Sequence, residues 1–217
     1  KNLPSPPTID MRTGGEHPDE LQIEEVARYL YKNPGSLRNL DTECGPLDGT
    51  GSVPQTEEAV RCLGTFLGLN SSRPDNDQGS GPDVLWYLPR RASWSMELKT
   101  DKQEGTSYSK KEVMQSVDHV QWVTDNEDVD EVQPYIVGPI RPADDRANPS
   151  DHLRVVELDE LSLIRNRVRV ALQNVLAKNL PVLLRSDIKR QFEAQGLLWS
   201  QLSARLLGSV LKEVDAG

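Results

Sequence analysis

The sequence contains little cysteine and no long apolar run. Its 217 residues include two cysteines, Cys44 and Cys62, with neither CxxC spacing nor a companion histidine cluster. A disulfide scaffold and a structural zinc site are therefore excluded, and a reducing, cytoplasmic compartment is the expected setting. No stretch approaches the ~18 consecutive apolar residues of a membrane-spanning helix, so we expect no membrane partner. Because the chain does not begin with methionine, we expect a segment of a larger protein.

Positive charge is also scarce. Acidic residues outnumber basic ones by 34 to 25, a formal net charge of −9, which excludes a protein whose whole surface attracts phosphate. A locally basic groove remains compatible with this composition. Residues 1–160 carry 16 basic and 30 acidic residues, a net of −14, whereas residues 161–217 carry nine and four, a net of +5. This asymmetry predicts that the two parts have different functions.

The basic residues that the chain does have offer candidate contacts to a phosphate backbone. Several cluster on two expected tail helices, and the alternative is that they neutralise the acidic body or cover apolar surface with their stems. The candidates for nucleic-acid contact are Lys110, Lys111, Arg165 and Arg169.

Proline, glycine and polar clusters divide the chain into a flexible lead-in at residues 1–15, an α/β core at 16–160 and a basic helical tail at 161–217. Apolar periodicity and two capping boxes, Ser52 with Gln55 and Ser109 with Glu112, predict the elements. Helices are expected at 18–32, 52–68, 109–123, 161–178, 186–194 and 199–214, strands at 84–88, 94–99, 134–138 and 153–158, and irregular polar stretches at 35–51 and 70–81.

Three charged side chains are expected to meet where two of these strands lie side by side. Gly81-Pro82-Asp83 opens one strand, and Glu97 and Lys99 lie near the end of the next. Residues i and i+2 of a strand point to the same side, so Glu97 and Lys99 project together, and a neighbouring strand can bring Asp83 beside them. Two adjacent carboxylates repel each other unless a cation lies between them, and Mg²⁺ prefers hard oxygen ligands. The pattern therefore predicts a divalent-cation site next to a lysine.

The same residues resemble the PD-(D/E)xK signature of the restriction-endonuclease-like nuclease superfamily. Pro82-Asp83 precedes Glu97-Leu98-Lys99 by thirteen intervening residues, and the resemblance covers roughly residues 52–158. It implies an αβββαβ core with a small mixed sheet, flanked here by an N-terminal helix and a C-terminal helical tail. It also implies Mg²⁺- or Mn²⁺-dependent phosphodiester hydrolysis, with Asp83 and Glu97 as metal ligands and Lys99 as the partner of the nucleophilic water.

Two helices carry further residues of the resemblance. Glu57, on the helix before the strands, would complete or adjust the metal site, and Glu58 competes with it for that role. Gln115, on the helix after the strands, would orient the lysine, the water or the scissile phosphate. His119 lies one turn further along the same face, at a position where related branches often carry tyrosine.

The sequence thus favours a metal-dependent DNA endonuclease domain that serves as a module of a larger nucleic-acid-processing or defence protein. Its expected partners are DNA, other domains or subunits of that protein, and a second copy in a homodimer. The alternative is a catalytically inactive nuclease-like fold that binds nucleic acid or protein. In the plainest interpretation, Glu97 and Lys99 form only a solvated ion pair worth ~0–1 kcal/mol. An α/β hydrolase is disfavoured because the sequence has no Gly-x-Ser-x-Gly elbow.

Overall fold

A computed structural model describes residues 17–103, 105–177 and 184–215, so the lead-in expected at residues 1–15 lies outside the described residues. The described part is a mixed α/β structure. Its elements in chain order are α1 (Pro18–Lys32), α2 (Ser36–Glu43), η1 (Gly45–Asp48), α3 (Val53–Phe66), β1 (Asn70–Ser72), α4 (Pro74–Gln78), β2 (Val84–Tyr87), β3 (Ala92–Leu98), α5 (Lys110–Asn126), β4 (Glu131–Val137), β5 (Arg154–Val156), α6 (Leu158–Leu176), α7 (Arg185–Ala194), α8 (Trp199–Arg205), β6 (Ser209–Val210) and η2 (Leu211–Glu213).

The strands form one six-stranded mixed sheet in the order β1-β2-β3-β4-β5-β6. The first three strands are antiparallel neighbours, β3, β4 and β5 run parallel, and β6 returns antiparallel to β5. Leu98 of β3 lies opposite Val137 of β4, which lies opposite Val156 of β5. The carboxyl ends of the three parallel strands therefore meet at one edge of the sheet.

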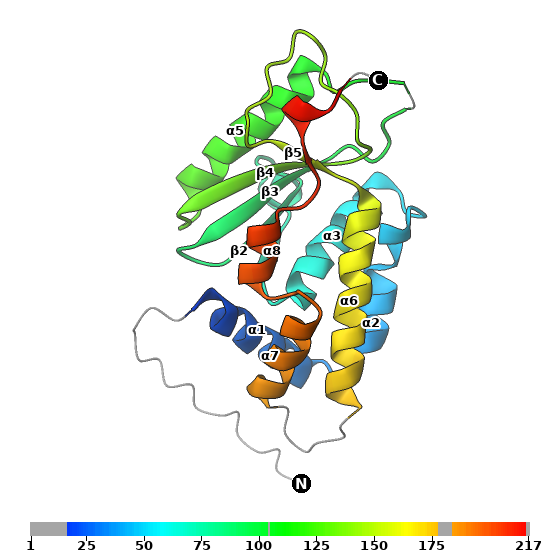
Figure 1. Cartoon of the computed structure of the whole chain (residues 1–217), viewed down its shortest axis with the longest axis vertical. Coiled ribbons are helices and arrows are strands. Elements are labelled where there is room, and N and C mark those ends of the chain that lie inside the picture. The colour runs from blue at the N-terminus through cyan, green and yellow to red at the C-terminus, as the bar shows by residue number, and fades with distance from the viewer. Residues whose placement is uncertain (1–16, 104, 178–183, 216–217) are drawn as a thin grey trace.

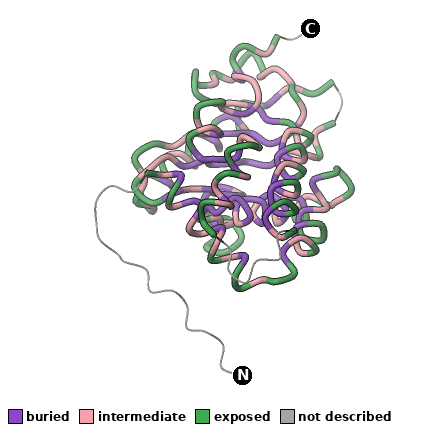
Figure 2. Tube along the Cα trace, turned by 60° about the horizontal axis from the view of Figure 1, so that its bottom comes forward, coloured by how far each residue is buried: buried purple, intermediate pink, exposed green. Residues whose placement is uncertain are grey.

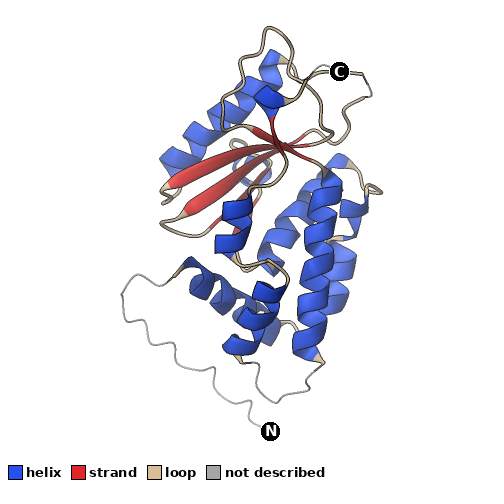
Figure 3. Ribbon diagram, viewed as in Figure 1, coloured by secondary structure: helices blue, strands red, loops and turns tan. Residues whose placement is uncertain are grey.

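Helices cover both faces of the sheet (Figures 1 and 3). On one face α5 packs its Val113 with Ile136 and Val155 of the strands. On the other face α1, α3, α6, α7 and α8 share a larger apolar core with the opposite side of the same strands, including Trp86 and Trp94. The side chains of successive strand residues point to opposite faces, so both faces of the central strands are buried (Figure 2).

Local sequence signals located several elements correctly. The first expected helix is α1, and strands occur within or across each of the four expected runs. Both capping boxes are present: the N–H of Ser52 donates to Gln55 Oε1 at 2.9 Å, and the N–H of Ser109 donates to Glu112 Oε2 at 2.7 Å. These interactions satisfy backbone donors that the first turns of α3 and α5 leave free.

The two polar stretches are more ordered than expected. Residues 35–51 contain α2 and η1, because Leu40 and Leu47 insert fully into the core although their neighbours are polar. Residues 70–81 contain β1 and α4. A short edge strand such as β1 carries little apolar pattern of its own, since its pairing with β2 defines it.

The expected all-helical tail is wrong in its last part. α8 ends at Arg205 rather than at Val214, and the chain then pairs β6 with β5. Leu206 and Gly208 both adopt positive φ, which ends the helix and turns the chain onto the sheet, and a side chain at Gly208 would overlap the Val155 carbonyl. The tail thus contributes a strand to the sheet.

The tail also packs into the main core. The buried amide of Gln22 on α1 donates to the carbonyls of Leu67 and Leu197, both at 2.9 Å, and accepts from the N–H of Trp199 at 2.7 Å. One side chain therefore links the N-terminal helix, the end of α3 and the tail. Within the described ranges, no helix is long and apolar enough to cross a membrane.

Candidate functional site

Strand pairing brings Asp83 opposite Glu97. Val84, the first residue of β2, lies opposite Met96 of β3, so the residue before Val84 faces the residue after Met96. The N–H of Leu98 donates a 2.7 Å hydrogen bond to Asp83 Oδ2, which fixes this carboxylate at the end of β3. Lys99 follows directly, and its own N–H donates to the Val137 carbonyl of β4 at 2.8 Å. The expected convergence of the three charged residues is confirmed.

Glu97 is buried between two potential cations. Only 2% of its side chain is exposed, which argues against the alternative that Glu97 and Lys99 form only a solvated ion pair. Lys99 Nζ lies 2.6 Å from Glu97 Oε1, and His119 Nδ1 on α5 lies 3.1 Å from Oε2. The histidine contact is not aligned as a hydrogen bond, and both of its atoms lack another hydrogen-bond partner among the described residues. Burial by itself raises the pKa of Glu97, but the contacts of His119 and Lys99 outweigh it and lower that pKa.

Of the two carboxylates Asp83 and Glu97, Asp83 has the less favourable environment for its charge. Burial, followed by the nearby charge of Glu97, raises the pKa of Asp83 to about 6, although the Leu98 N–H and Lys99 oppose the shift. Lys99 behaves in the opposite sense. Burial is the largest single influence and lowers the pKa of Lys99, but the hydrogen bond to Glu97 and the charges of Glu97 and Asp83 together outweigh it and raise that pKa, so Lys99 stays an ammonium. The site is therefore an unequal carboxylate pair beside a fixed cation.

The structure separates the two candidate glutamates of α3. Glu57 is 15% exposed and its charge acts on Asp83, whereas Glu58 is 46% exposed and pairs with Arg61. Burial raises the pKa of Glu57, and Arg73 opposes this through an ion pair with the Glu57 carboxylate. Glu57 is thus the α3 carboxylate on the side of the site.

Sequence reasoning missed Arg73. It follows β1 in the stretch expected to be irregular, its side chain is 13% exposed, and its Nε has no hydrogen-bond partner within the described part of the chain. A single arginine in a polar segment carries no periodic or spacing signal. Only the pairing of β1 with β2 places it beside α3.

α5 supplies the residues on the far side of the site. His119 reaches Glu97, whereas Gln115 is half-buried and its side chain has no hydrogen-bond partner in the described ranges. The helix is held against the chain before Asp83 by Trp122, whose Nε1 donates to Ser80 Oγ at 3.2 Å. Gly81 fits beneath the Trp122 ring, because a Cβ there would come within 2.9 Å of it.

The expected nucleic-acid contacts are divided by the fold. Lys110 and Lys111 are exposed in the first turn of α5. Arg165 is 6% exposed, and its guanidinium binds Asp48 and the Cys44 carbonyl, so we assign it to the interior rather than to a DNA surface. Arg169 forms an ion pair with Asp41.

Asp83 and Glu97 offer the donor chemistry that a hard divalent cation prefers, and their mutual repulsion is what such an ion relieves. However, Lys99 and His119 contact both oxygens of Glu97 in this arrangement, and no group of three or more His, Cys, Asp or Glu in the described part is disposed to hold a metal. The residues fit the ion chemically, and Glu97 must exchange a cation contact to bind it.

Next to Lys99 lies an open cavity of about 210 Å³ at the carboxyl ends of the parallel strands, lined by Thr100, Gly138, Pro139, Glu157, Leu158 and Asp159. It adjoins the charged residues without including Asp83 or Glu97. This edge of a parallel sheet is where ligands commonly bind. Searches of protein-family models, curated proteins and solved structures found no match to this chain.

Proposed function

We propose that this chain is a metal-dependent nuclease that hydrolyses phosphodiester bonds in DNA. The observation that carries the proposal is the convergence of Asp83, Glu97 and Lys99, with Lys99 Nζ 2.6 Å from a carboxylate that is almost fully buried. An ion pair with only a structural role would be expected on the surface. Burying the charges costs desolvation free energy, and the attraction between the two charges alone does not recover that cost. Function explains why the chain retains the buried pair.

The proposed fold is the restriction-endonuclease-like one. α3, β1, β2, β3, α5 and β4 follow one another in the order αβββαβ that the sequence resemblance implies, with the short α4 inserted between β1 and β2. The parallel pairing of β3 with β4 gives the small mixed sheet of that arrangement. This order supports the functional proposal, and the remaining helices and strands are additions to it.

Asp83 and Glu97 would hold Mg²⁺ or Mn²⁺, with Glu57 as an additional carboxylate. A bound ion would supply positive charge that polarises the phosphodiester and the attacking water. Lys99 has a raised pKa, so it acts as a hydrogen-bond donor and a cation beside the developing phosphate charge, not as a base. The side-chain amide of Gln115 has no hydrogen-bond partner among the described residues, which suits a role in orienting substrate or water.

The test is cleavage of DNA by purified protein with Mg²⁺ or Mn²⁺, compared with Asp83→Ala and Lys99→Ala. Each substitution should lower the cleavage rate by about 10²-fold or more, since each removes a preorganised charge. Asp128→Ala is the matched control, because its carboxylate is 77% exposed and pairs with Arg90 on the surface. Circular dichroism shows whether the variants fold. Equal residual cleavage by wild type and both site variants would refute the assignment.

A second candidate is a nuclease-like fold without catalysis that acts as a binding module. It is favoured by the occupation of both Glu97 oxygens by Lys99 and His119. Titration with Mn²⁺, followed by electron paramagnetic resonance, separates the two. Binding that Asp83→Asn abolishes supports the nuclease, whereas absent Mn²⁺ binding in a protein that still binds DNA supports the module.

A further inference from the structure

Most basic side chains of the tail are already paired with carboxylates. Arg165 lies 2.8 Å from Asp48, and Arg190 lies 2.6 Å from Asp187. The other paired cations are Arg169 with Asp41, Arg185 with Glu24, Lys189 with Glu20 and Lys212 with Asp151. Among the described tail residues, Arg167 and Arg205 have no ion-pair partner, whereas the other basic side chains neutralise acidic groups of the body and of the tail itself.

Three cations that have no carboxylate partner among the described residues lie near one another at the opposite end of the molecule, although single unpaired cations such as Arg38 also occur elsewhere. Lys110 and Lys111 are exposed and form no ion pair with any described residue. Arg141, in the loop after β4, also lacks one, and its Nε is buried without a hydrogen-bond partner in the described ranges. The helix that carries the two lysines has 17 residues, so its N-terminus adds the positive end of a dipole.

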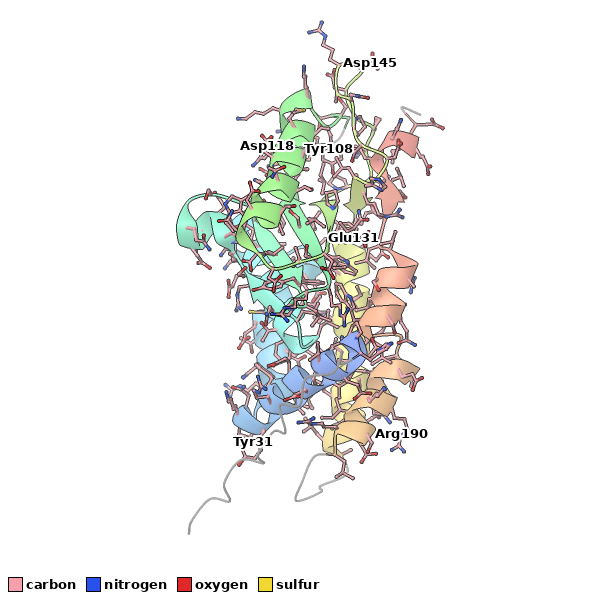
Figure 4. The ribbon with its side chains drawn as sticks, turned by 90° about the vertical axis from the view of Figure 1, so that its left-hand side faces the viewer. Tyr31, Tyr108, Asp118, Glu131, Asp145 and Arg190 are labelled. Atoms are coloured by element: carbon pink, nitrogen blue, oxygen red, sulfur yellow. The ribbon has the colours of Figure 1, made fainter. Side chains whose placement is uncertain are left out.

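The loop and the start of α5 are joined through Tyr108. Its N–H donates to the Pro142 carbonyl, its carbonyl accepts from the N–H of Asp144, and its hydroxyl donates to the Pro139 carbonyl, each at 2.8 Å. Figure 4 shows Tyr108 and the loop residue Asp145 at one end and Arg190 of the tail at the other. Lys110, Lys111 and Arg141 therefore belong to one surface, which we call the loop–helix surface.

This surface adjoins the candidate site. Gly138 directly follows β4 and lies against Lys99, since a Cβ on it would come within 2.8 Å of both the Lys99 carbonyl oxygen and the Tyr108 hydroxyl. The loop that carries Arg141 therefore starts beside Lys99. A DNA strand bound to this loop would therefore lie close to the proposed site of Asp83, Glu97 and Lys99.

Of the acidic groups near the surface, Glu112 is already paired, whereas Asp144 and Asp145 offset part of the charge of the three cations. Glu112 binds Lys102 at 2.9 Å and caps α5 through Ser109. Asp144 accepts the N–H of Arg146 through Oδ1 at 2.9 Å. Asp145 lies at the outer tip of the loop (Figure 4).

We propose that the sugar-phosphate backbone of the DNA binds the loop–helix surface of Lys110, Lys111 and Arg141, not the basic helices of the tail. This inference rests on the proposed nuclease function and locates its substrate. Its recognition chemistry is phosphate binding by cations that have no carboxylate partner among the described residues, so the contact is independent of base sequence.

The test measures binding of a fluorescently labelled DNA duplex at several salt concentrations, in Ca²⁺ so that binding is separated from turnover. The triple variant K110A/K111A/R141A is compared with R185A/K189A/R190A, which loses the same charge from the tail. Loss of three duplex phosphate contacts should lower the slope of log affinity against log salt by about 2.7. The tail variant should keep the wild-type slope and affinity. Thermal unfolding monitors folding, and K110A/K111A, which changes only exposed residues, gives a second variant with a decrease of about 1.8.

An equal or larger loss in the tail variant, or an unchanged slope in the loop–helix variants, would overturn the proposal. So would a wild-type protein that does not bind DNA, including one that binds an acidic protein instead. The nuclease proposal fails separately: a protein that binds DNA through this surface but never cleaves it refutes catalysis alone. If K110A/K111A/R141A still cleaves DNA and binds it with unchanged affinity, only the proposed role of the loop–helix surface is refuted.

Discussion

The ionised form of Asp83 is unfavourable in the folded protein, which is not expected of a residue with a purely structural role. Its pKa is raised to about 6 by burial and by the charge of Glu97. In the folded protein it therefore holds a proton more tightly than in the unfolded chain between about pH 4 and 6. The raised pKa of Asp83 does not change the free energy of unfolding below the unfolded pKa. It lowers that free energy as the pH rises through this window, and the loss is complete above the folded pKa. The raised pKa corresponds to at most about 3 kcal/mol.

Asp83→Asn should stabilise the protein at pH 8 in EDTA by up to about 3 kcal/mol, and the gain should vanish by pH 4. The amide removes the charge that faces Glu97, and its oxygen can still accept the hydrogen bond from Leu98. Urea unfolding at both pH values measures the difference. Asp128→Asn serves as the exposed control, with no pH-dependent gain. A variant less stable than wild type at pH 8 would contradict this account.

The strand residues of the site and their neighbours Glu57 and His119 could be predicted from the sequence, whereas Arg73 could not. Glu97 and Lys99 share a side because of the two-residue repeat of a strand, and Asp83 joins them through the pairing of neighbouring strands. Arg73 and Glu57 meet only because β1 pairs with β2 beside α3. That contact depends on tertiary packing, for which the local sequence has no signal.

At the scale of elements, the segment before β2 controls where Asp83 lies. Gly81 has φ of 100° and would place a Cβ within 2.9 Å of both Pro74 Cβ and the Trp122 ring. Gly79 has φ of 73°, yet a Cβ there would meet nothing within 4 Å. The two glycines share the backbone requirement and differ in the space around them.

Gly81→Ala should therefore lower stability more than Gly79→Ala. We expect a loss of about 1 kcal/mol for the control, from backbone strain alone, and about 2–4 kcal/mol for Gly81→Ala, from strain plus overpacking against α5. The displacement of Asp83 should also weaken Mn²⁺ binding in Gly81→Ala only. Chemical denaturation and Mn²⁺ titration measure both effects. Equal losses in the two variants would show that Trp122 does not constrain the segment.

Helices and strands that have a capping motif or an apolar repeat in their own sequence were predicted well. Elements that exist only through pairing with a neighbouring strand were not. α3 and α5 begin at capping boxes whose residues stand three apart in the sequence. The apolar repeat of Val113, Val117 and Val120 predicts the buried side of α5 less well: Val113 is buried, but Val117 is 41% exposed and Ser116 is buried instead. β6 has two residues and exists only through the edge of β5. No helical or strand period can reveal such an element.

On the scale of the whole molecule, the division of charge in the sequence has a structural explanation. The positive tail is bound to the negative body by ion pairs such as those of Arg165 and Lys212. The tail also shares the main core, so its charge is part of the fold. The remaining acidic excess includes Glu57, Asp83 and Glu97, which lie together around one site. Neutralising this cluster should therefore stabilise the whole fold.

Addition of Mn²⁺ should raise the melting temperature of the wild-type protein. An ion that binds only the folded state at 100 times its dissociation constant stabilises it by about 2.7 kcal/mol, which corresponds to roughly 5–10 °C for a chain of this size. Asp83→Asn should lose this response because a ligand is gone. Lys99→Ala should keep it, or enlarge it, because Glu97 is freed from its 2.6 Å contact with Lys99, even though cleavage is lost.

Differential scanning fluorimetry against Mn²⁺ concentration measures the response, with Asp128→Ala as the control that should match wild type. The decisive comparison is between Asp83→Asn and Lys99→Ala, since both remove a charge from the same site and only one removes a proposed ligand. If the two variants respond alike, Asp83 does not bind the ion. If the wild type itself shows no shift, Glu97 stays paired with Lys99 and His119, and the fold serves as a binding module.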